Sequence, residues 1–115
     1  MFSPVVNFVS GEGPDTRMQG FTIQDGWADS GGGIYMVDAS PTLDDLVVTG
    51  NASGWDDGAG IYVQRGSPSI STTQITGNSA DLSYCGYEYG AGGGIAMLDS
   101  DAILDNVTID GNFAG

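Results

Sequence analysis

The sequence predicts an all-β solenoid, a right-handed parallel β-helix of three to four coils with three short strands in each coil. Three observations carry this prediction: blocks of residues that recur in a fixed order, apolar positions that alternate, and glycine at 20 of 115 positions. Alternation with a period of two indicates strands, and abundant glycine indicates tight turns between them. We therefore expect residues 1–115 to form one small domain, which is either a whole solenoid or a fragment of a longer one.

The first recurring element is rich in glycine and leads into a strand. Its copies are Gly-Gly-Gly-Ile-Tyr-Met at 31–36, Gly-Ala-Gly-Ile-Tyr-Val at 58–63 and Gly-Gly-Gly-Ile-Ala-Met at 92–97. Successive side chains of a strand point to opposite faces. The first copy therefore predicts that Ile34 and Met36 point inward and that Tyr35 points outward, and the other copies repeat this assignment.

Two further elements follow in each repeat. The second is Ser40-Pro41-Thr42-Leu43, Ser67-Pro68-Ser69-Ile70 and Asp101-Ala102-Ile103-Leu104. The third is Val48-Thr49-Gly50-Asn51, Ile75-Thr76-Gly77-Asn78 and Ile109-Asp110-Gly111-Asn112. Inward positions across both elements are Met18/Phe21/Ile23, Leu43/Leu46/Val48, Ile70/Thr73/Ile75 and Leu104/Val107/Ile109. The two-residue gap in this pattern predicts a corner between two short strands. A single coil cannot bury its apolar face, so stacking must form the core.

Two columns of polar residues are expected to support the stack. The equivalent residues Asn51, Asn78 and Asn112 fall at one corner, where asparagine tolerates left-handed turns and stacked amides can bond from coil to coil. Asp38, Arg65 and Asp99 are also equivalent. They form either a ladder of alternating charge or three unrelated surface charges, and the sequence leaves both interpretations open.

These repeats resemble the right-handed parallel β-helix proteins of the pectate-lyase-like superfamily, especially large bacterial surface and secreted proteins built from such coils. The glycine-rich element is also similar to the GGAI motif of the chlamydial polymorphic outer-membrane proteins. The resemblance covers residues 5–114 and implies the fold, with an extracellular or cell-surface location. It implies little about activity, because one fold hosts many functions.

The charge balance excludes several partners. The chain has 15 acidic residues against 2 basic residues and no histidine, with a net charge of −13. Nucleic acid and anionic membranes would repel it. The excess of acidic residues has two interpretations. The favoured one is solubility at high salt concentration, and the other is Ca²⁺ binding. No other cofactor is expected. No apolar run is long enough to span a membrane, and no signal peptide is visible.

The repeats differ in length almost entirely between the asparagine corner and the glycine-rich strand, and this variable corner is the predicted binding face. The candidate ligand-binding residues are Trp27, Tyr35, Trp55, Tyr62, Tyr84, Tyr87 and Tyr89. Aromatic faces beside carboxylates suit sugar rings, although the same side chains could simply pack the loops onto the solenoid. Asp29, Asp56 and Asp57 form the candidate metal site. Cys85 is either a reactive thiol or a buried inert one.

The expected function is a non-catalytic structural or adhesive module that binds carbohydrate through its aromatic- and Asp-rich corner. The alternative is a polysaccharide lyase or glycoside hydrolase. The resemblance implies that such enzymes combine aspartates with basic catalytic residues, whereas Arg17 and Arg65 are the sole basic residues here. No catalytic residue is therefore assigned. Neither end of the predicted solenoid looks capped, so we expect self-association through an apolar end, as a dimer.

Overall fold

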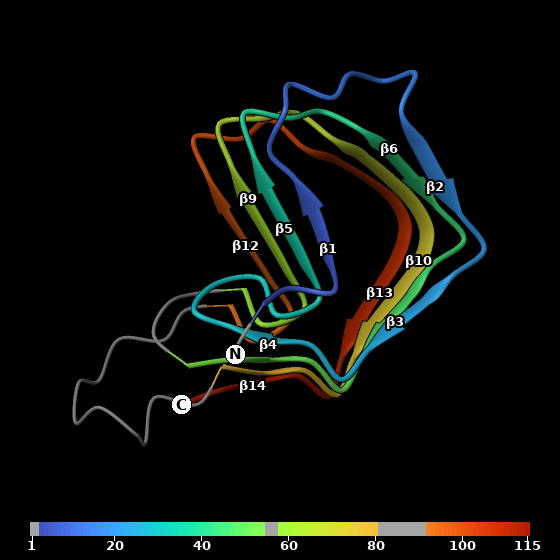
Figure 1. Cartoon of the computed structure of the whole chain (residues 1–115). Coiled ribbons are helices and arrows are strands. Elements are labelled where there is room, and N and C mark those ends of the chain that lie inside the picture. Colours follow the sequence, from blue (N-terminus) through green and yellow to red (C-terminus); the bar gives the residue numbers. More distant parts are fainter. Residues whose placement is uncertain (1–2, 55–57, 81–91) are drawn as a thin grey trace.

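A computed structural model describes residues 3–54, 58–80 and 92–115 (Figure 1). All regular elements of these residues are β-strands, and every pair of strands runs parallel. The prediction of an all-β protein built from parallel strands is therefore confirmed.

Within these ranges the chain passes through three sheets in the same order in each of its repeats. The first sheet contains β1 (Val6–Phe8), β5 (Ile34–Val37), β9 (Ile61–Gln64) and β12 (Ile95–Leu98). The second sheet contains β2 (Arg17–Gln19), β3 (Thr22–Gln24), β6 (Thr42–Asp44), β7 (Val47–Thr49), β10 (Ser69–Thr76) and β13 (Ile103–Asp110). The third sheet contains β4 (Trp27–Ala28), β8 (Ala52–Ser53), β11 (Ser79–Ala80) and β14 (Phe113–Ala114). We call β1–β4, β5–β8, β9–β11 and β12–β14 the first, second, third and fourth repeats.

The register between repeats matches the equivalences expected from the sequence. Ile34 pairs with Ile61, and Ile61 pairs with Ile95, in the first sheet. In the second sheet Ile70 pairs with both Leu43 and Leu104. Figure 1 shows the strands of each sheet lying side by side, so residues from distant parts of the sequence meet at every inward position.

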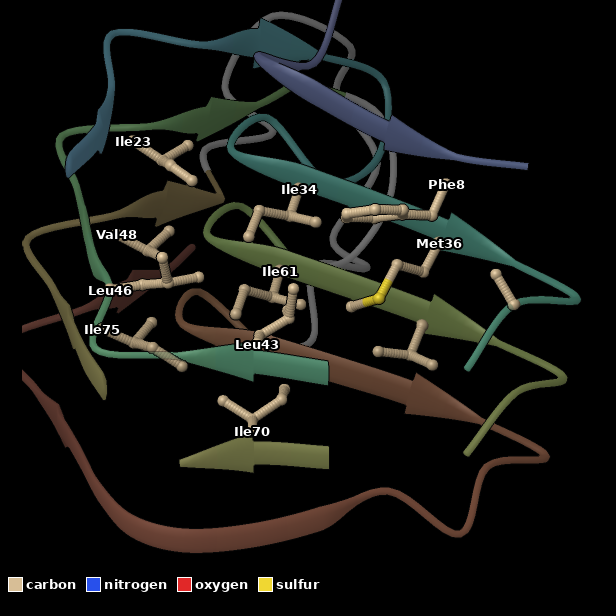
Figure 2. Close-up of a cluster of buried hydrophobic side chains, with 12 residues drawn as sticks. Phe8, Ile23, Ile34, Met36, Leu43, Leu46, Val48, Ile61, Ile70 and Ile75 are labelled. Carbon is tan, nitrogen blue, oxygen red and sulfur yellow. The ribbon is translucent and has the colours of Figure 1, made fainter. Parts of the chain in front are cut away.

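The inward residues form one continuous apolar core (Figure 2). Its members include Phe8, Ile23, Ile34, Met36, Leu43, Leu46, Val48, Ile61, Val63, Ile70 and Ile75. Most are 0% exposed, and burying one such side chain stabilises a fold by about 1.5–3 kcal/mol. Phe21 differs from this pattern because it is 57% exposed, although its equivalent Leu46 is 1% exposed. Phe21 belongs to the first repeat, whose described strands in the second sheet pair only with those of the second repeat.

The chain turns from strand to strand at residues with positive φ. The predicted two-residue corner is present, with φ of 53° at Asp45, 48° at Thr72 and 54° at Asn106. The asparagine corner differs from the expectation. Its left-handed residues are Gly50, Gly77 and Gly111, each immediately before an asparagine. Glycine adopts positive φ without a Cβ penalty, which leaves the asparagine side chain to point inward.

The third sheet was not expected from the sequence. Trp27-Ala28 and Ala52-Ser53 were expected to be part of the variable connection, but they form β4 and β8. Each repeat therefore contains a two-residue strand after the asparagine position, in addition to the strands of the other two sheets. Two residues are too few to show an alternating pattern, and their inward members Ala28, Ser53 and Ala80 are small.

Candidate functional site

The predicted ligand surface is only partly within the described residues. Trp27, Tyr35 and Tyr62 are described, whereas Trp55, Tyr84, Tyr87, Tyr89 and Cys85 lie outside the described ranges. Tyr35 and Tyr62 lie in the first sheet, on β5 and β9, and Trp27 lies in the third sheet, on β4. The fold therefore brings the two tyrosines together and places the tryptophan on a different sheet.

Tyr35 and Tyr62 form a stacked pair on the outer side of the first sheet. They are partners in register, their ring centroids lie 5.4 Å apart, and their planes differ by 9°. Such a pair contributes about 0.5–1.5 kcal/mol beyond its buried area. Tyr62 is only 9% exposed, and its hydroxyl donates a hydrogen bond to Gln64 Oε1 at 3.4 Å. Because the two rings stack, each covers one face of the other, which reduces the aromatic area that a sugar could contact.

Trp27 is the more accessible aromatic side chain of the three. It is 36% exposed, while its neighbour Ala28 is 6% exposed, as expected for outward and inward positions of a strand. The indole packs against the backbone of Gly54, where an added Cβ would lie 3.4 Å from Trp27 Cζ2. Ser3 pairs with Trp27 in an antiparallel bridge on the other side of β4. The indole therefore packs against Gly54 on one side, and the backbone of Trp27 is separately bridged to Ser3.

The predicted metal site is represented by one residue. Asp29 is exposed and follows β4 directly, whereas Asp56 and Asp57 lie outside the described residues. Within residues 3–54, 58–80 and 92–115, no three His, Cys, Asp or Glu side chains gather closely enough to hold an ion. Calcium binding at this corner stays a prediction.

A ladder of buried asparagine amides runs through the interior, as predicted. Asn51 Nδ2 donates to Asn78 Oδ1 at 3.0 Å, and Asn78 Nδ2 donates to Asn112 Oδ1 at 2.9 Å. The same oxygens accept the backbone N–H groups of Asn51 and Asn78, both at 3.0 Å. Each amide also donates to a carbonyl of the preceding repeat, at Ile23, Val48 or Ile75. Asn51 and Asn78 are 1% exposed and fully bonded, so the ladder stabilises the stack instead of weakening it.

A column of glycines makes room for this ladder, a relation that the sequence analysis missed. A Cβ on Gly33 would lie 2.9 Å from Asn51 Nδ2, and a Cβ on Gly60 would lie 3.0 Å from Asn78 Nδ2. The same positions would also meet backbone carbonyls of the next repeat at 2.5 Å. The last glycine of the Gly-x-Gly-Ile motif is therefore required by packing. The Gly-x-Gly-Ile motif and the corner asparagine recur with a constant spacing along the sequence. This constant spacing was the signal that could have linked them.

Both arginines of the chain are engaged in ion pairs between neighbouring repeats. Arg65 donates from Nε and Nη2 to the two carboxylate oxygens of Asp38, at 2.9 and 3.0 Å. Of the two interpretations that the sequence left open, the ladder is therefore correct for Asp38 and Arg65, and Asp99 on the other side adds only a Coulombic attraction. Arg17 donates to Asp44 Oδ2 at 3.1 Å, a pair that the sequence analysis did not find.

The ion pairs move the pKa values of their carboxyl groups away from neutrality. Two hydrogen bonds from Arg65 lower the pKa of Asp38, and Asp38 raises the pKa of Arg65. The hydroxyl of Ser71, followed by Arg17, lowers the pKa of Asp44. A general acid or base works best with a pKa near the working pH, so these shifts run opposite to what acid–base catalysis needs.

No protein-family model, curated protein or solved structure matches this chain. Among the described residues, no helix is long and apolar enough to cross a lipid bilayer. The functional argument therefore rests on the geometry described above.

Proposed function

We propose that the three sheets wrap one interior as a right-handed parallel β-helix and that this solenoid is a non-catalytic structural or adhesive module. The repeated order of the sheets and the register between repeats support a solenoid of four coils. Right-handed connection between parallel strands is the rule for such crossovers, which supports the hand.

The engagement of both arginines is the observation that carries the non-catalytic assignment. With no histidine or lysine in the chain, Arg17 and Arg65 are its only basic side chains, and each is tied to an aspartate of the adjacent repeat. As the resemblance implies, a polysaccharide lyase needs a basic residue beside carboxylates at the reacting bond, whereas a glycoside hydrolase needs two carboxylates that face each other across a groove. Within residues 3–54, 58–80 and 92–115, apolar side chains and the asparagine ladder fill the interior, so the reaction would find no site there.

The proposal also includes carbohydrate binding, and among the described residues Trp27 is the main residue proposed to contact the sugar. The partly exposed indole can offer an apolar surface to a sugar ring, and the exposed Asp29 two residues later can accept hydrogen bonds from hydroxyl groups. Tyr35 and Tyr62 act chiefly as packing residues in this scheme. The module belongs to an extracellular or cell-surface protein, a location that the resemblance of its repeats supports.

Activity assays and titrations with the same substrates test the proposal. We expect pectic and neutral polysaccharides to yield neither new reducing ends nor unsaturated products, with or without Ca²⁺. Oligosaccharides should bind the full chain, and Trp27→Ala should weaken that binding about tenfold while the thermal melt shows an intact fold. Cleavage of any substrate would overturn the non-catalytic assignment, and unchanged binding by Trp27→Ala would remove the carbohydrate site from Trp27.

A further inference from the structure

Two Asn-x-Ser/Thr triplets occur in the chain, and the structure places them in opposite environments. They are Asn51-Ala52-Ser53 and Asn106-Val107-Thr108. This pattern is the acceptor for N-linked glycans, and an acceptor has to lie at the surface of the folded protein. The first triplet begins at the asparagine corner, and the second begins at the two-residue corner within β13. The surroundings of each asparagine therefore decide which triplet is able to carry a glycan.

The triplet that begins at Asn51 is closed to modification in the folded protein. Asn51 and Ser53 are each 1% exposed. The side-chain amide of Asn51 donates to Ile23 O at 2.9 Å and to Asn78 Oδ1 at 3.0 Å, so both of its N–H groups are engaged. A sugar on Nδ2 would replace one of these hydrogens and would need space that the close-packed interior does not leave. A glycan on Asn51 is therefore incompatible with the ladder.

Asn106 lies at a corner whose residues point outward in every repeat that contains it. Asn106 is exposed, with φ of 54°. Its equivalents Asp45 and Thr72 are exposed as well, although their repeats are paired with neighbouring strands on both sides. Figure 1 shows β10 and β13 bending at this corner, with the convex side facing away from the first sheet. The exposure of Asn106 is therefore a property of the corner and does not depend on which repeat lies beside it.

The hydroxyl group that completes the second triplet lies on the same outer side. Thr108 is exposed, whereas Val107 is half-buried and packs against the core. This is the alternation expected along a strand, which leaves the third residue of the triplet facing solvent. Gln74, the partner of Thr108 in β10, is also exposed. An enzyme can therefore approach the amide of Asn106 and the hydroxyl of Thr108 together without opening the stack.

We propose that Asn106 is a site of N-linked glycosylation, with Thr108 completing the acceptor. The co-substrate is an oligosaccharide activated as a lipid diphosphate, which an oligosaccharyltransferase presents to the chain. Asn106 Nδ2 attacks the anomeric carbon of this oligosaccharide, and a C–N bond forms as the bond from that carbon to the phosphate oxygen breaks. The lipid diphosphate leaves with the electron pair of the broken bond, and the amide nitrogen loses one proton. This inference rests on the proposed extracellular or cell-surface location, because the acceptor pattern is used in secreted proteins.

The test is expression of the full chain, preceded by a cleavable secretion leader, in eukaryotic cells. The secreted protein is purified, its fold is checked by a thermal melt, and the occupancy of each triplet is measured by mass spectrometry before and after treatment with peptide N-glycosidase. We expect a glycan on Asn106 and an unmodified Asn51 in the folded fraction. The glycan should leave the melting transition cooperative, because the corner points away from the core and from the asparagine ladder.

Two variants remove the acceptor by introducing residues that other repeats carry at the same positions. Asn106→Asp introduces the residue found as Asp45 in the second repeat, where φ is also positive. Thr108→Val introduces the residue found as Val47. Both variants should therefore keep the fold, and each should reduce the occupancy of residue 106 to background.

Ser53→Ala is the matched control, because it removes the other triplet. The equivalent residues of the third sheet are Ala28 and Ala80, so alanine fits this column, and the glycan should remain in place. An unmodified Asn106 in the secreted protein, or a glycan on Asn51 in the folded fraction, would overturn the proposal. Sugar binding and polysaccharide cleavage are measured on glycan-free chain from bacterial cells. The inference can therefore fail while the proposed function stands, and the converse also holds.

Discussion

The first and fourth repeats have the same design but differ in how well they are covered. Phe8 and Met97 occupy one column of the first sheet, and Ile23 and Ile109 occupy one column of the second. The residues of the first repeat are 7% and 1% exposed, and those of the fourth are 43% and 47% exposed. Equivalent positions are thus not equally buried, and the cover beside each repeat decides how much an inward side chain stabilises the protein.

Local features distinguish the first repeat from the fourth. Ser3 bridges to Trp27 in the antiparallel sense, so part of the outer edge of β4 is already paired. Gly26 ends the asparagine ladder by donating its backbone N–H to Asn51 Oδ1 at 2.9 Å. The fourth repeat has neither feature in its described residues. Covering of the first repeat is nevertheless incomplete, as the exposed side chain of Phe21 shows.

The largest expected contrast is between two apolar residues in one column. Ile70→Ala removes a side chain that is 0% exposed, and we expect the free energy of unfolding to fall by about 2–5 kcal/mol. Leu104→Ala, at its partner position, removes a side chain that is 37% exposed and should cost about 1 kcal/mol. Urea unfolding of both variants measures the difference. Equal losses would mean that the fourth repeat is covered in solution.

The asparagine ladder gives a second contrast. Asn78→Asp replaces the amide that donates to Val48 O and Asn112 Oδ1 with an acceptor, and we expect a loss of about 3 kcal/mol from buried unpaired groups. Asn112→Asp loses only the bond to Ile75 O at a partly covered site and should cost about 1 kcal/mol. The same unfolding experiment compares them at neutral pH. If the ladder does not stabilise the fold, both variants should lose a small and similar amount of unfolding free energy.

A corner residue offers a stabilising change. Thr72 has φ of 48°, a left-handed conformation that is costly for a β-branched residue, whereas Asn106 occupies the same corner of the next repeat with φ of 54°. We expect Thr72→Asn to raise stability by about 1 kcal/mol. Asn106→Thr is the matched reverse change and should lower stability by a similar amount. A neutral result at both positions would show that the corner relaxes around threonine.

The smallest effect is expected from the ion pair of Arg65 with Asp38. The folded-state pKa of Asp38 lies below its ordinary value of 3.8, so the pair stabilises the protein above that pH and the contribution is lost as the pH falls through the lowered pKa. Arg65→Gln should therefore lower the melting temperature slightly at neutral pH, more at low salt than at high salt. Wild type and variant should converge once the pH falls below the lowered pKa of Asp38. A difference that stays constant from neutral to acidic pH would show that Arg65 acts through packing.

Much of the stack could be predicted because identical residue types mark identical positions. Ile34, Ile61 and Ile95 align in sequence and in register, since a one-residue slip would turn every inward side chain outward. The asparagine ladder was expected for the same reason. The residue with positive φ at the asparagine corner was assigned wrongly. Gly50 and Asn51 both favour positive φ, and only the structure shows which of the two adopts it.

The candidate site was less predictable than the stack. Sequence alternation places Tyr35 and Tyr62 on the outside, but it does not indicate that they stack and cover each other. The pair of Arg17 with Asp44 depends on the offset between two neighbouring strands, which no motif marks. The third sheet was missed because its strands contain two residues each.

The longer connection between the third and fourth repeats leaves the register of the stack unchanged. Ala80 ends β11 and Gly92 precedes β12, yet Asn78 bonds to Asn112 just as Asn51 bonds to Asn78, although 34 residues separate the first pair and 27 the second. Chain length at this corner is therefore uncoupled from the hydrogen-bonded frame. The frame can serve as a display scaffold, in which new segments are grafted at one corner while every column keeps its alignment.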